Sequence, residues 1–192
     1  MQTIARKGKL VLKDGSVYEG ELYGKRNAVG EVVFTTGMSG YQETLTDPSF
    51  CGQIVVMTYP LVGNYGTNDL FNQGRKSFFQ GYVISELCDH PSNWRCEKTL
   101  EQFLDEQDVP VLTGVDTRAI TRKLRNYGVL QGVIVPAEMP QEEVEKLLAT
   151  PEVHDQVATV TTPEIYTLGN GKYHVAVMDL SLIHISEPTR QE

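Results

Sequence analysis

Residues 31–68 read EVVFTTGMSGYQETLTDPSFCGQIVVMTYPLVGNYGTN. Two β-branched, apolar runs stand out, Glu31–Phe34 and Gln53–Tyr59, and we expect both to be strands. The residues 38–53 between them are small and polar, which is typical of a loop, and a second turn-rich segment follows the second strand. Two such loops around one strand suggest that the segment positions residues rather than merely connecting strands.

Further strands are predicted on both sides of this stretch. Leu10–Gly15 ends in Asp-Gly and is followed by the strand-forming sequence SVYEGELYG, so a hairpin is expected around Asp14 and Gly15. Gln80–Ile84 adds a fifth strand. The first part of the chain is therefore expected to be mainly antiparallel sheet.

After residue 96 the apolar residues recur with a helical period. Leu100, Phe103 and Leu104 lie at i, i+3 and i+4, which predicts an amphipathic helix over Glu97–Gln107. Asp116 is expected to cap a second helix that buries Ile120, Leu124 and Tyr127 and stops at Gly128. The remaining elements expected are short strands at Val111–Leu112 and Leu130–Val135 and a helix over Gln141–Ala149. This order predicts an α/β layer attached to the early sheet, and hence an α/β fold class.

The last forty residues are expected to differ from the rest. Residues 1–150 form the predicted main domain, and 151–171, with two prolines and Gly169-Asn170-Gly171, are expected to be a linker. Tyr173–Met178 reads as a buried strand of the kind that opens a parallel sheet.

Composition excludes several classes of protein. The 192 residues carry a net charge of −8, with a pI near 5.0, so neither a nucleic acid nor an anionic membrane is an expected partner. No run of 18 apolar residues occurs, and the three cysteines form no C-x-x-C pair. We expect a cytoplasmic protein without a metal site.

Common catalytic patterns are missing. Residues 63–67, GNYGT, lack the lysine of a phosphate-binding loop and are interpreted as a turn. Cys51 has no histidine near it in sequence and is expected to be a buried small residue rather than a nucleophile. The four histidines show no metal-ligand spacing and are expected to be surface or packing residues; they are His90, His154, His174 and His184.

A row of arginines contrasts with the acidic background. Arg118, Arg122 and Arg125 follow i, i+4, i+7 spacing on the helix after Asp116, and Lys123 lies beside them. The row is either an ordinary solvated face or a docking surface for an acidic patch on a partner. The sequence leaves both interpretations open.

Three blocks of sequence carry a resemblance to a known family. Residues 30–68 resemble the N-terminal domain of the small, glutamine-dependent chain of carbamoyl phosphate synthetase. GVDTRAITRKLRNYGVLQGVI, residues 114–134, is similar to a second block of that family, and HVAVMDL, residues 174–180, to a third. Together the resemblance extends from about Lys9 to Leu180.

The resemblance implies a fold, and it implies different roles for two domains and for two chains. It implies a layered β/β/α N-terminal domain followed by a class I glutamine amidotransferase domain with a Cys, His and Glu triad. The complete small chain would release ammonia from L-glutamine for a large chain that makes carbamoyl phosphate in pyrimidine and arginine synthesis. No cofactor is implied for this chain, since ATP and divalent metal would bind the large chain.

The same resemblance assigns one residue to the glutamine pocket. Ser49, in the turn Thr46-Asp47-Pro48-Ser49, corresponds to a serine that reaches the substrate from the N-terminal domain. A hydroxyl can both donate and accept a hydrogen bond, so it could fix a polar end of glutamine. The competing interpretation is that Ser49 only closes its turn. The three glycines Gly37, Gly40 and Gly52 are expected to allow a close approach to the neighbouring domain.

The chain departs from the family pattern at its end. Residues 172–180 correspond to the start of a truncated glutaminase domain, and 181–192, SLIHISEPTRQE, match nothing in the family and read as a non-native tail. We therefore assign no catalytic residue and expect the chain alone to be inactive. The leading hypothesis is the N-terminal part of the synthetase small chain. The alternatives are a stand-alone, non-catalytic domain that docks on the large chain, and an unrelated small-molecule-binding protein.

Overall fold

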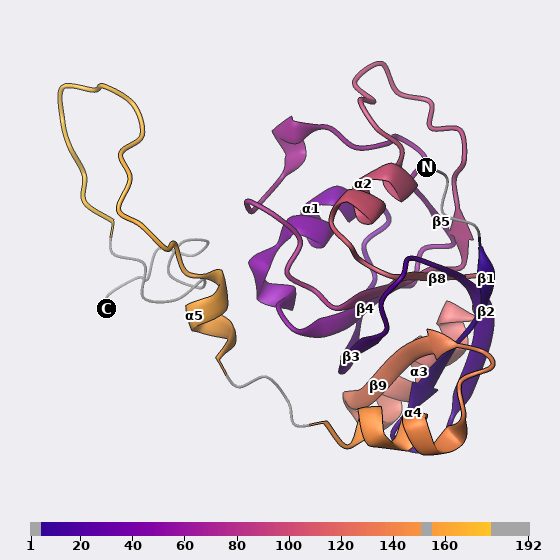
Figure 1. The fold of residues 1–192 in the computed structure, drawn as a ribbon. Helices are drawn as coiled ribbons and strands as arrows, with labels where there is room; N and C mark the ends of the chain where they lie inside the picture. The colour runs from indigo at the N-terminus through magenta and orange to yellow at the C-terminus, as the bar shows by residue number, and fades with distance from the viewer. Residues whose placement is uncertain (1–4, 151–154, 178–192) are drawn as a thin grey trace. The chain divides into compact units, whose positions relative to one another are not determined.

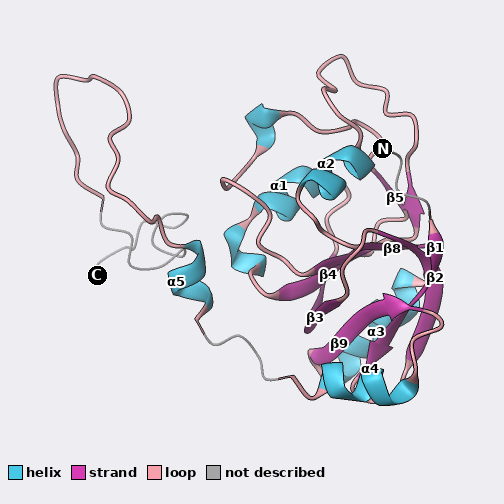
Figure 2. Cartoon of the chain, in the orientation of Figure 1, coloured by secondary structure: helices cyan, strands magenta, loops and turns pink. Residues whose placement is uncertain are grey.

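Seven strands close into a single barrel in a computed structural model that describes residues 5–150 and 155–177 (Figures 1 and 2). The order around the barrel is β1-β2-β8-β6-β4-β3-β9. The strands are β1 (Arg6–Leu12), β2 (Val17–Tyr23), β3 (Ala28–Thr35), β4 (Gln53–Met57), β6 (Gly81–Val83), β8 (Val111–Thr113) and β9 (Leu130–Pro136). A separate parallel pair is formed by β5 (Leu61–Val62) and β7 (Glu86–Leu87).

The predicted hairpin and the α/β fold class are confirmed. β1 and β2 pair antiparallel from Arg6 opposite Leu22 to Val11 opposite Val17. The turn is closed by the Ser16 carbonyl, which accepts from the Leu12 N–H at 2.9 Å. The other antiparallel pairs are β1 with β9, β2 with β8 and β3 with β9, whereas β3, β4, β6 and β8 run parallel to one another in succession.

The expected division into an early sheet and a later attached layer is wrong. β8 lies between β2 and β6, and β9 lies between β1 and β3, so the late strands complete the same barrel. The β1–β2 hairpin has an unpaired edge on each side. β9 forms backbone hydrogen bonds with β1 at one edge, and β8 forms them with β2 at the other. The layered β/β/α description is not seen in this pairing.

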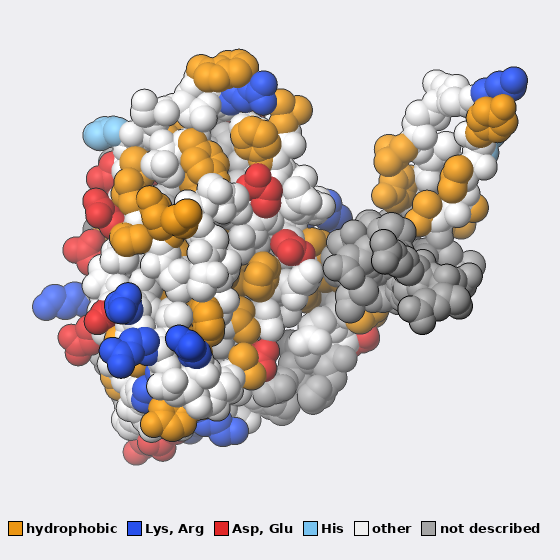
Figure 3. All heavy atoms as spheres, turned by 180° about the vertical axis from the view of Figure 1, so that it is seen from behind, with side chains coloured by type: hydrophobic (Ala, Val, Ile, Leu, Met, Phe, Trp, Pro, Cys, Tyr) orange, Lys and Arg blue, Asp and Glu red, His pale blue; other side chains and the backbone are white. Residues whose placement is uncertain are grey.

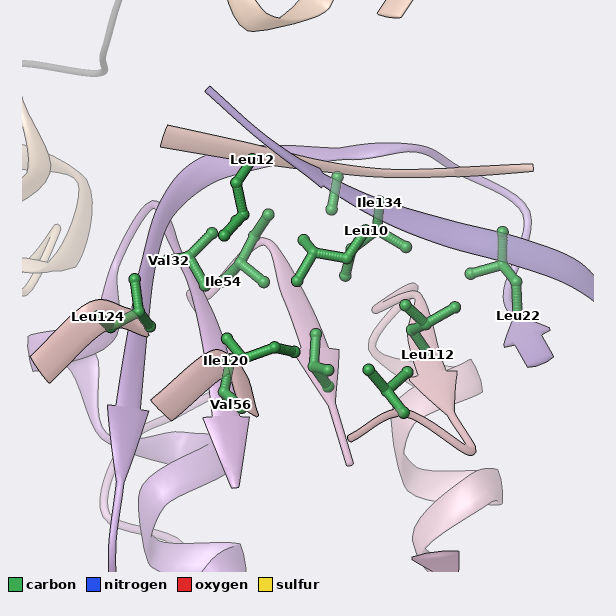
Figure 4. Packing of buried hydrophobic residues seen from close by; sticks show 13 residues of the cluster. Leu10, Leu12, Leu22, Val32, Ile54, Val56, Leu112, Ile120, Leu124 and Ile134 are labelled. Atoms are coloured by element: carbon green, nitrogen blue, oxygen red, sulfur yellow. The ribbon is translucent and has the colours of Figure 1, made fainter. Parts of the chain in front are cut away.

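The interior of the barrel is an apolar core to which every one of the seven strands contributes (Figure 4). Val32, Ile54 and Ile134 are fully buried there. Ile120 and Leu124 of helix α3 (Thr117–Tyr127) join this core, so that α3 packs against strand residues such as Val56. Burial of these side chains anchors α3 firmly to the barrel.

Three other helices cover the outside of the barrel. α1 (Tyr41–Thr46) and α2 (Leu100–Glu106) pack over β4, β6 and β8 through a second apolar cluster. α4 (Gln141–Leu148) packs over β1 and β9, where Val144 is buried. β4 has an apolar cluster on each side, with Ile54 and Val56 in the barrel core and Val55 and Met57 in the second cluster, which explains why it reads IVVM without alternation.

The periodic helices form close to the predicted positions. α2 begins three residues later than expected because Thr99 caps it: its side chain accepts from the Gln102 N–H, and the Gln102 side chain accepts from the Thr99 N–H. Tyr127 was assigned to the wrong environment. It lies on the apolar stripe of α3 but is the last residue of the helix, one turn beyond the buried Leu124, and it is 76% exposed.

The sequence interpretation missed α1 and two short 3-10 turns. Residues 38–53 were expected to be a loop, yet Tyr41–Thr46 form α1 and Pro48–Phe50 form the turn η1. A second turn, η2, spans Asp69–Phe71. The polar residues of α1 concealed it, because a buried helix of six residues has too few apolar positions to show a period.

Residues 155–177 belong to a second unit, which we describe separately. A short helix, α5 (Gln156–Val160), lies within the segment 151–171 that was expected to be a linker, and the role of the segment as a linker stays a prediction. The predicted strand at Tyr173–Met178 is wrong for its described residues, since Tyr173–Val177 form no strand and remain exposed. A buried strand needs hydrogen-bonded neighbours, and the described residues supply none to it. The tail at 181–192 lies outside the described residues.

Candidate functional site

Ser49 lies at an exposed turn between α1 and β4. Asp47 caps the turn: its Oδ1 accepts from the Ser49 N–H at 2.8 Å. The Pro48 carbonyl accepts from the Cys51 N–H at 3.0 Å. The Ser49 hydroxyl itself makes no hydrogen bond to the described residues, so the backbone and Asp47 close the turn. The side chain is left accessible to another molecule.

The turn rests on a helix that is held from inside by buried polar side chains. Gln42, fully buried, donates through Nε2 to the Asn68 carbonyl and, at 2.7 Å, to Asn72 Oδ1. Its Oε1 accepts from the Asn68 N–H at 3.0 Å. Thr46, at the end of the helix, accepts from the Gln73 N–H at 2.8 Å. α1 is thereby fastened to the segment that follows β5.

Two tyrosines fasten the other end of α1 to the same segment. The rings of Tyr41 and Tyr65 stack with centroids 4.1 Å apart. The Tyr41 hydroxyl donates to the Gly66 carbonyl at 2.6 Å, and the Tyr65 oxygen accepts from the N–H groups of Gly40 and Tyr41 at 3.0 and 3.1 Å. The two turn-rich segments of the opening sequence therefore support each other.

Burial keeps three tyrosines and one cysteine of this region neutral. Desolvation raises the pKa of Tyr41, Tyr65 and Tyr82, so their phenols keep their protons at any physiological pH. Burial also raises the pKa of the Cys51 thiol. Because the thiolate is the nucleophilic form, the neutral, 8%-exposed Cys51 has the environment of a packing residue, as the sequence analysis expected.

Three buried oxygens have no hydrogen-bond partner among the described residues: Glu43 Oε2, Ser77 Oγ and Tyr82 Oη. Glu43 belongs to α1, and its carboxylate raises the pKa of Tyr65 further.

Sequence reasoning missed Gln42, Thr46, Tyr65 and Asn68 as supports of the site. The spacing of Tyr41 with Leu45 and of Gln42 with Thr46, both i and i+4, was the available signal.

The glycines near the site differ in what they do. Gly40, which precedes α1, and Gly52, which follows η1, have φ values of 76° and 80°. L side chains rarely adopt this backbone conformation, so the two glycines let the chain enter and leave the α1–η1 segment. Gly37 is exposed and is not among the described positive-φ glycines. Close approach to another domain stays a prediction for all three.

The remaining candidates show no catalytic arrangement in residues 5–150 and 155–177. Residues 63–66 form a turn, in which the Gly63 carbonyl accepts from the Gly66 N–H at 3.0 Å. His90 and His174 are exposed, and His154 and His184 lie outside the described residues. No group of three His, Cys, Asp or Glu side chains could hold a metal ion, and no helix there is both long and apolar enough to cross a membrane.

The three arginines of α3 all point outward. Arg118, Arg122 and Arg125 are exposed and form no ion pair with any residue in the described part of the chain. Lys123 differs: its Nζ donates to Asp14 Oδ2 at 2.6 Å and also to Ser16 Oγ. Figure 3 shows a group of Lys and Arg side chains on one part of the surface, with Asp and Glu side chains beside it.

Comparison with known proteins agrees with the resemblance found in the sequence. The family model described as "Carbamoyl-phosphate synthase small chain, CPSase domain" matches residues 10–134. The carbamoyl phosphate synthase pyrimidine-specific small chain of Halalkalibacterium halodurans is 44% identical over 180 residues, which cover 93% of this chain and 50% of that protein.

Two further relatives give the same picture. The carbamoyl phosphate synthase small chain of Caldanaerobacter subterraneus subsp. tengcongensis is 54% identical over 140 residues, covering 72% of this chain and 39% of the relative. The pyrimidine-specific small chain of Bacillus subtilis is 44% identical over 181 residues, 93% of this chain and 50% of that protein. The chain thus spans about half the length of the curated relatives it matches.

Proposed function

The chain belongs to the carbamoyl phosphate synthase small chain family, and we propose that it acts as the N-terminal part of a small chain in glutamine-dependent carbamoyl phosphate synthesis. In this proposal the glutaminase domain of the complete small chain hydrolyses L-glutamine. The ammonia released passes to the large chain, which binds ATP and divalent metal. The N-terminal part contributes a contact to glutamine without carrying out the chemistry.

The observation that carries this proposal is the unpartnered hydroxyl of Ser49. It is exposed on a turn whose backbone is fixed by Asp47 and Pro48, and α1 beneath the turn is fastened by Gln42 and Thr46. A hydroxyl held in this way loses little freedom when it binds a substrate. It could donate to the carboxylate of glutamine or accept from its ammonium group, while the other domain holds the reacting amide.

The chemistry of Cys51 supports a non-catalytic role for the N-terminal part. Amide hydrolysis of this kind needs an activated thiolate with a base beside it. Cys51 is buried, and burial raises its pKa, which disfavours the thiolate. We propose that the 192-residue chain alone does not hydrolyse glutamine. Measured release of ammonia from glutamine by the purified chain would refute this.

The test of the Ser49 assignment is Ser49→Ala in the complete small chain, assembled with the large chain. Loss of one hydrogen bond to a charged group is worth about 1.5–3 kcal/mol, so kcat/KM for glutamine should fall about ten- to a hundredfold. Synthesis from free ammonia should be unchanged, because that route does not use the glutamine pocket. Steady-state kinetics with each nitrogen source measures both.

A matched control separates the site from general effects of removing a serine. Ser92 is also exposed, and only its backbone N–H takes part in a hydrogen bond, to the Asn64 carbonyl. Ser92→Ala should therefore leave both activities unchanged. If Ser49→Ala used glutamine as well as the wild type does, the serine would have no part in substrate binding.

A further inference from the structure

The segment that follows the turn η2 runs alongside the Ser49 turn and is hydrogen-bonded to both of its ends. Before the turn, Thr46 Oγ1 accepts from the Gln73 N–H at 2.8 Å. After the turn, the Gly52 N–H donates to the Phe78 carbonyl at 3.2 Å. The residues of this segment that lie between the two hydrogen bonds therefore border the turn that presents the serine.

The segment and the turn are in direct contact between these hydrogen bonds. A Cβ built on Gly74 would lie 2.6 Å from the Thr46 carbonyl oxygen and 3.1 Å from Pro48 Cγ, so only glycine allows this approach. Lys76 is two residues further on, and its Cα thus lies within about 7 Å of the Gly74 Cα. Ser49 directly follows Pro48. A lysine side chain, with its flexible four-carbon stem, is long enough to bring its ammonium group to the turn.

The Lys76 ammonium is held over a buried ring. Its Nζ lies 5.2 Å from the centroid of the Phe78 ring, and Phe78 is 7% exposed. Such a cation–π contact favours one position of the ammonium over free movement in solvent. Burial raises the pKa of the Cys51 thiol, and the Lys76 ammonium lowers it by a smaller amount. Because Cys51 is two residues after Ser49, the positive charge lies near the Ser49 turn.

Neither the Lys76 ammonium nor the Ser49 hydroxyl has an ion-pair or hydrogen-bond partner in residues 5–150 and 155–177. An ammonium group has three donors and no acceptor, and the hydroxyl supplies a further donor. Neighbouring donors without an acceptor are suited to an anion, above all a carboxylate. The competing interpretation is that Lys76 only covers the ring of Phe78.

The charges of glutamine decide which end of it fits. At neutral pH its α-carboxylate is negative, its α-amino group is positive and its side-chain amide is uncharged. Lys76 attracts the carboxylate and repels the amino group, and the Ser49 hydroxyl can donate to the same carboxylate. The two residues together therefore favour one orientation of the substrate.

We propose that Lys76 binds the α-carboxylate of L-glutamine together with Ser49 and is a specificity-determining residue of the small chain. The inference rests on the proposed function, in which Ser49 contacts glutamine. It adds a second residue to that contact and fixes the orientation of the substrate. The carboxylate faces the N-terminal part, and the reacting amide faces the glutaminase domain.

The test is Lys76→Met in the complete small chain, assembled with the large chain. Methionine keeps an unbranched side chain over the Phe78 ring and removes the charge. The carboxylate is not the reacting group, so the lysine binds it equally in the ground state and in the transition state. KM for glutamine should therefore rise about five- to tenfold with kcat unchanged, and synthesis from free ammonia should be unaffected.

A change of substrate separates carboxylate binding from a structural role. The α-amide of L-glutamine has a neutral group in place of the carboxylate. The ratio of kcat/KM for glutamine to kcat/KM for this amide should fall about five- to tenfold in Lys76→Met. Lys76→Arg keeps the charge and should retain most of the ratio. An equal loss with both substrates would mean that the lysine only supports the turn, and the inference would be wrong.

A matched variant controls for the loss of a surface charge. Lys146 on α4 is exposed and its side chain forms no ion pair with the described residues. Lys146→Met should keep both kinetic constants for glutamine within about twofold of the wild type. Melting curves of the variants establish that each is folded. Equal kinetics in Lys76→Met and Lys146→Met would overturn the inference.

Failure of this inference and failure of the proposed function give different results. If Ser49→Ala impaired the use of glutamine and Lys76→Met did not, the lysine would have no part in binding and the proposed function would stand. If neither variant changed the glutamine kinetics, both the serine contact and the lysine contact would be refuted.

Discussion

The phenol oxygen of Tyr65 caps the N-terminus of α1, which has no capping side chain of its own. The residue before the helix is Gly40, which has no side chain to accept from the free N–H groups of the first turn. Tyr65 supplies the acceptor from 24 residues further along the chain, by bonding the N–H groups of Gly40 and Tyr41 at 3.0 and 3.1 Å. One oxygen therefore decides whether the helix below the Ser49 turn begins correctly.

Tyr65→Phe should lower the free energy of unfolding by about 1–3 kcal/mol. The ring and its stacking on Tyr41 remain, so the cost is that of two partly buried N–H groups without an acceptor. Urea denaturation measures it as a shift of the midpoint at constant slope. Tyr59→Phe removes a hydroxyl from a residue that is 39% exposed and should cost nothing measurable. Equal stability of the two variants would show that the Tyr65 oxygen does not cap α1.

At the scale of elements, the β1–β2 hairpin is tied to α3 by one ion pair. The Lys123 ammonium donates to Asp14 Oδ2 at 2.6 Å, and this hydrogen bond lowers the pKa of the Asp14 carboxyl. A carboxyl with a lowered pKa in the folded state stabilises the fold above its unfolded pKa, about 3.9, and this stability is lost as the pH falls through the folded pKa. The Lys123–Asp14 ion pair therefore stabilises the fold less at acidic pH.

Lys123→Met should consequently be less stable than the wild type at pH 7, by less than about 1 kcal/mol because the pair is partly exposed. The difference should diminish as the pH falls below the unfolded pKa of Asp14, about 3.9, and through its lowered folded pKa. Denaturation of the two proteins over a series of pH values from 7 downward measures this. Lys13→Met removes an exposed lysine without an ion pair and should show no difference that depends on pH. A constant difference for Lys123→Met would contradict the pKa argument.

The elements that could be predicted from sequence are those with enough length to show a period. Helices α2, α3 and α4 and the β1–β2 hairpin were predicted within a few residues. Helix α1 was not predicted, because it is stabilised by hydrogen bonds from Gln42 and Thr46 to residues 68–73. Such contacts between distant segments leave no periodic pattern in the sequence. The exposed Ser49 turn was located only through the family resemblance. Its supports at Gln42 and Tyr65 became apparent from the structure.

At the scale of the whole molecule, the barrel core is packed so closely that some of its glycines have no space for a Cβ atom. Gly132 of β9 lies beside Val32 of the neighbouring strand β3: a Cβ built on Gly132 would lie 2.5 Å from Val32 Cγ2 and 3.1 Å from Leu12 Cδ2. Val32 is β-branched and fully buried, so it has little freedom to move aside. The strand order could not be predicted, since it depends on such close contacts between distant segments.

Gly132→Ala should destabilise the protein by about 1–3 kcal/mol through overpacking. Val32→Ala should also destabilise it, by leaving a cavity. The double variant should be more stable than the sum of the two effects predicts, because the new methyl group occupies part of that cavity. A double-mutant cycle by urea denaturation measures the coupling. Strict additivity would mean that the two positions do not meet inside the barrel.

The pairing of β1 with β9 also has a consequence for the order in which the protein is made. Residues 6–12 leave the ribosome well before one of their two hydrogen-bonded neighbours, residues 130–136, which is synthesised more than a hundred residues later. Until then the first hairpin has an open edge, and strand edges of this kind pair readily with other chains. A topology dominated by such distant contacts folds slowly. Biogenesis of the chain therefore passes through a stage at which protection of the nascent hairpin by a chaperone would raise the yield.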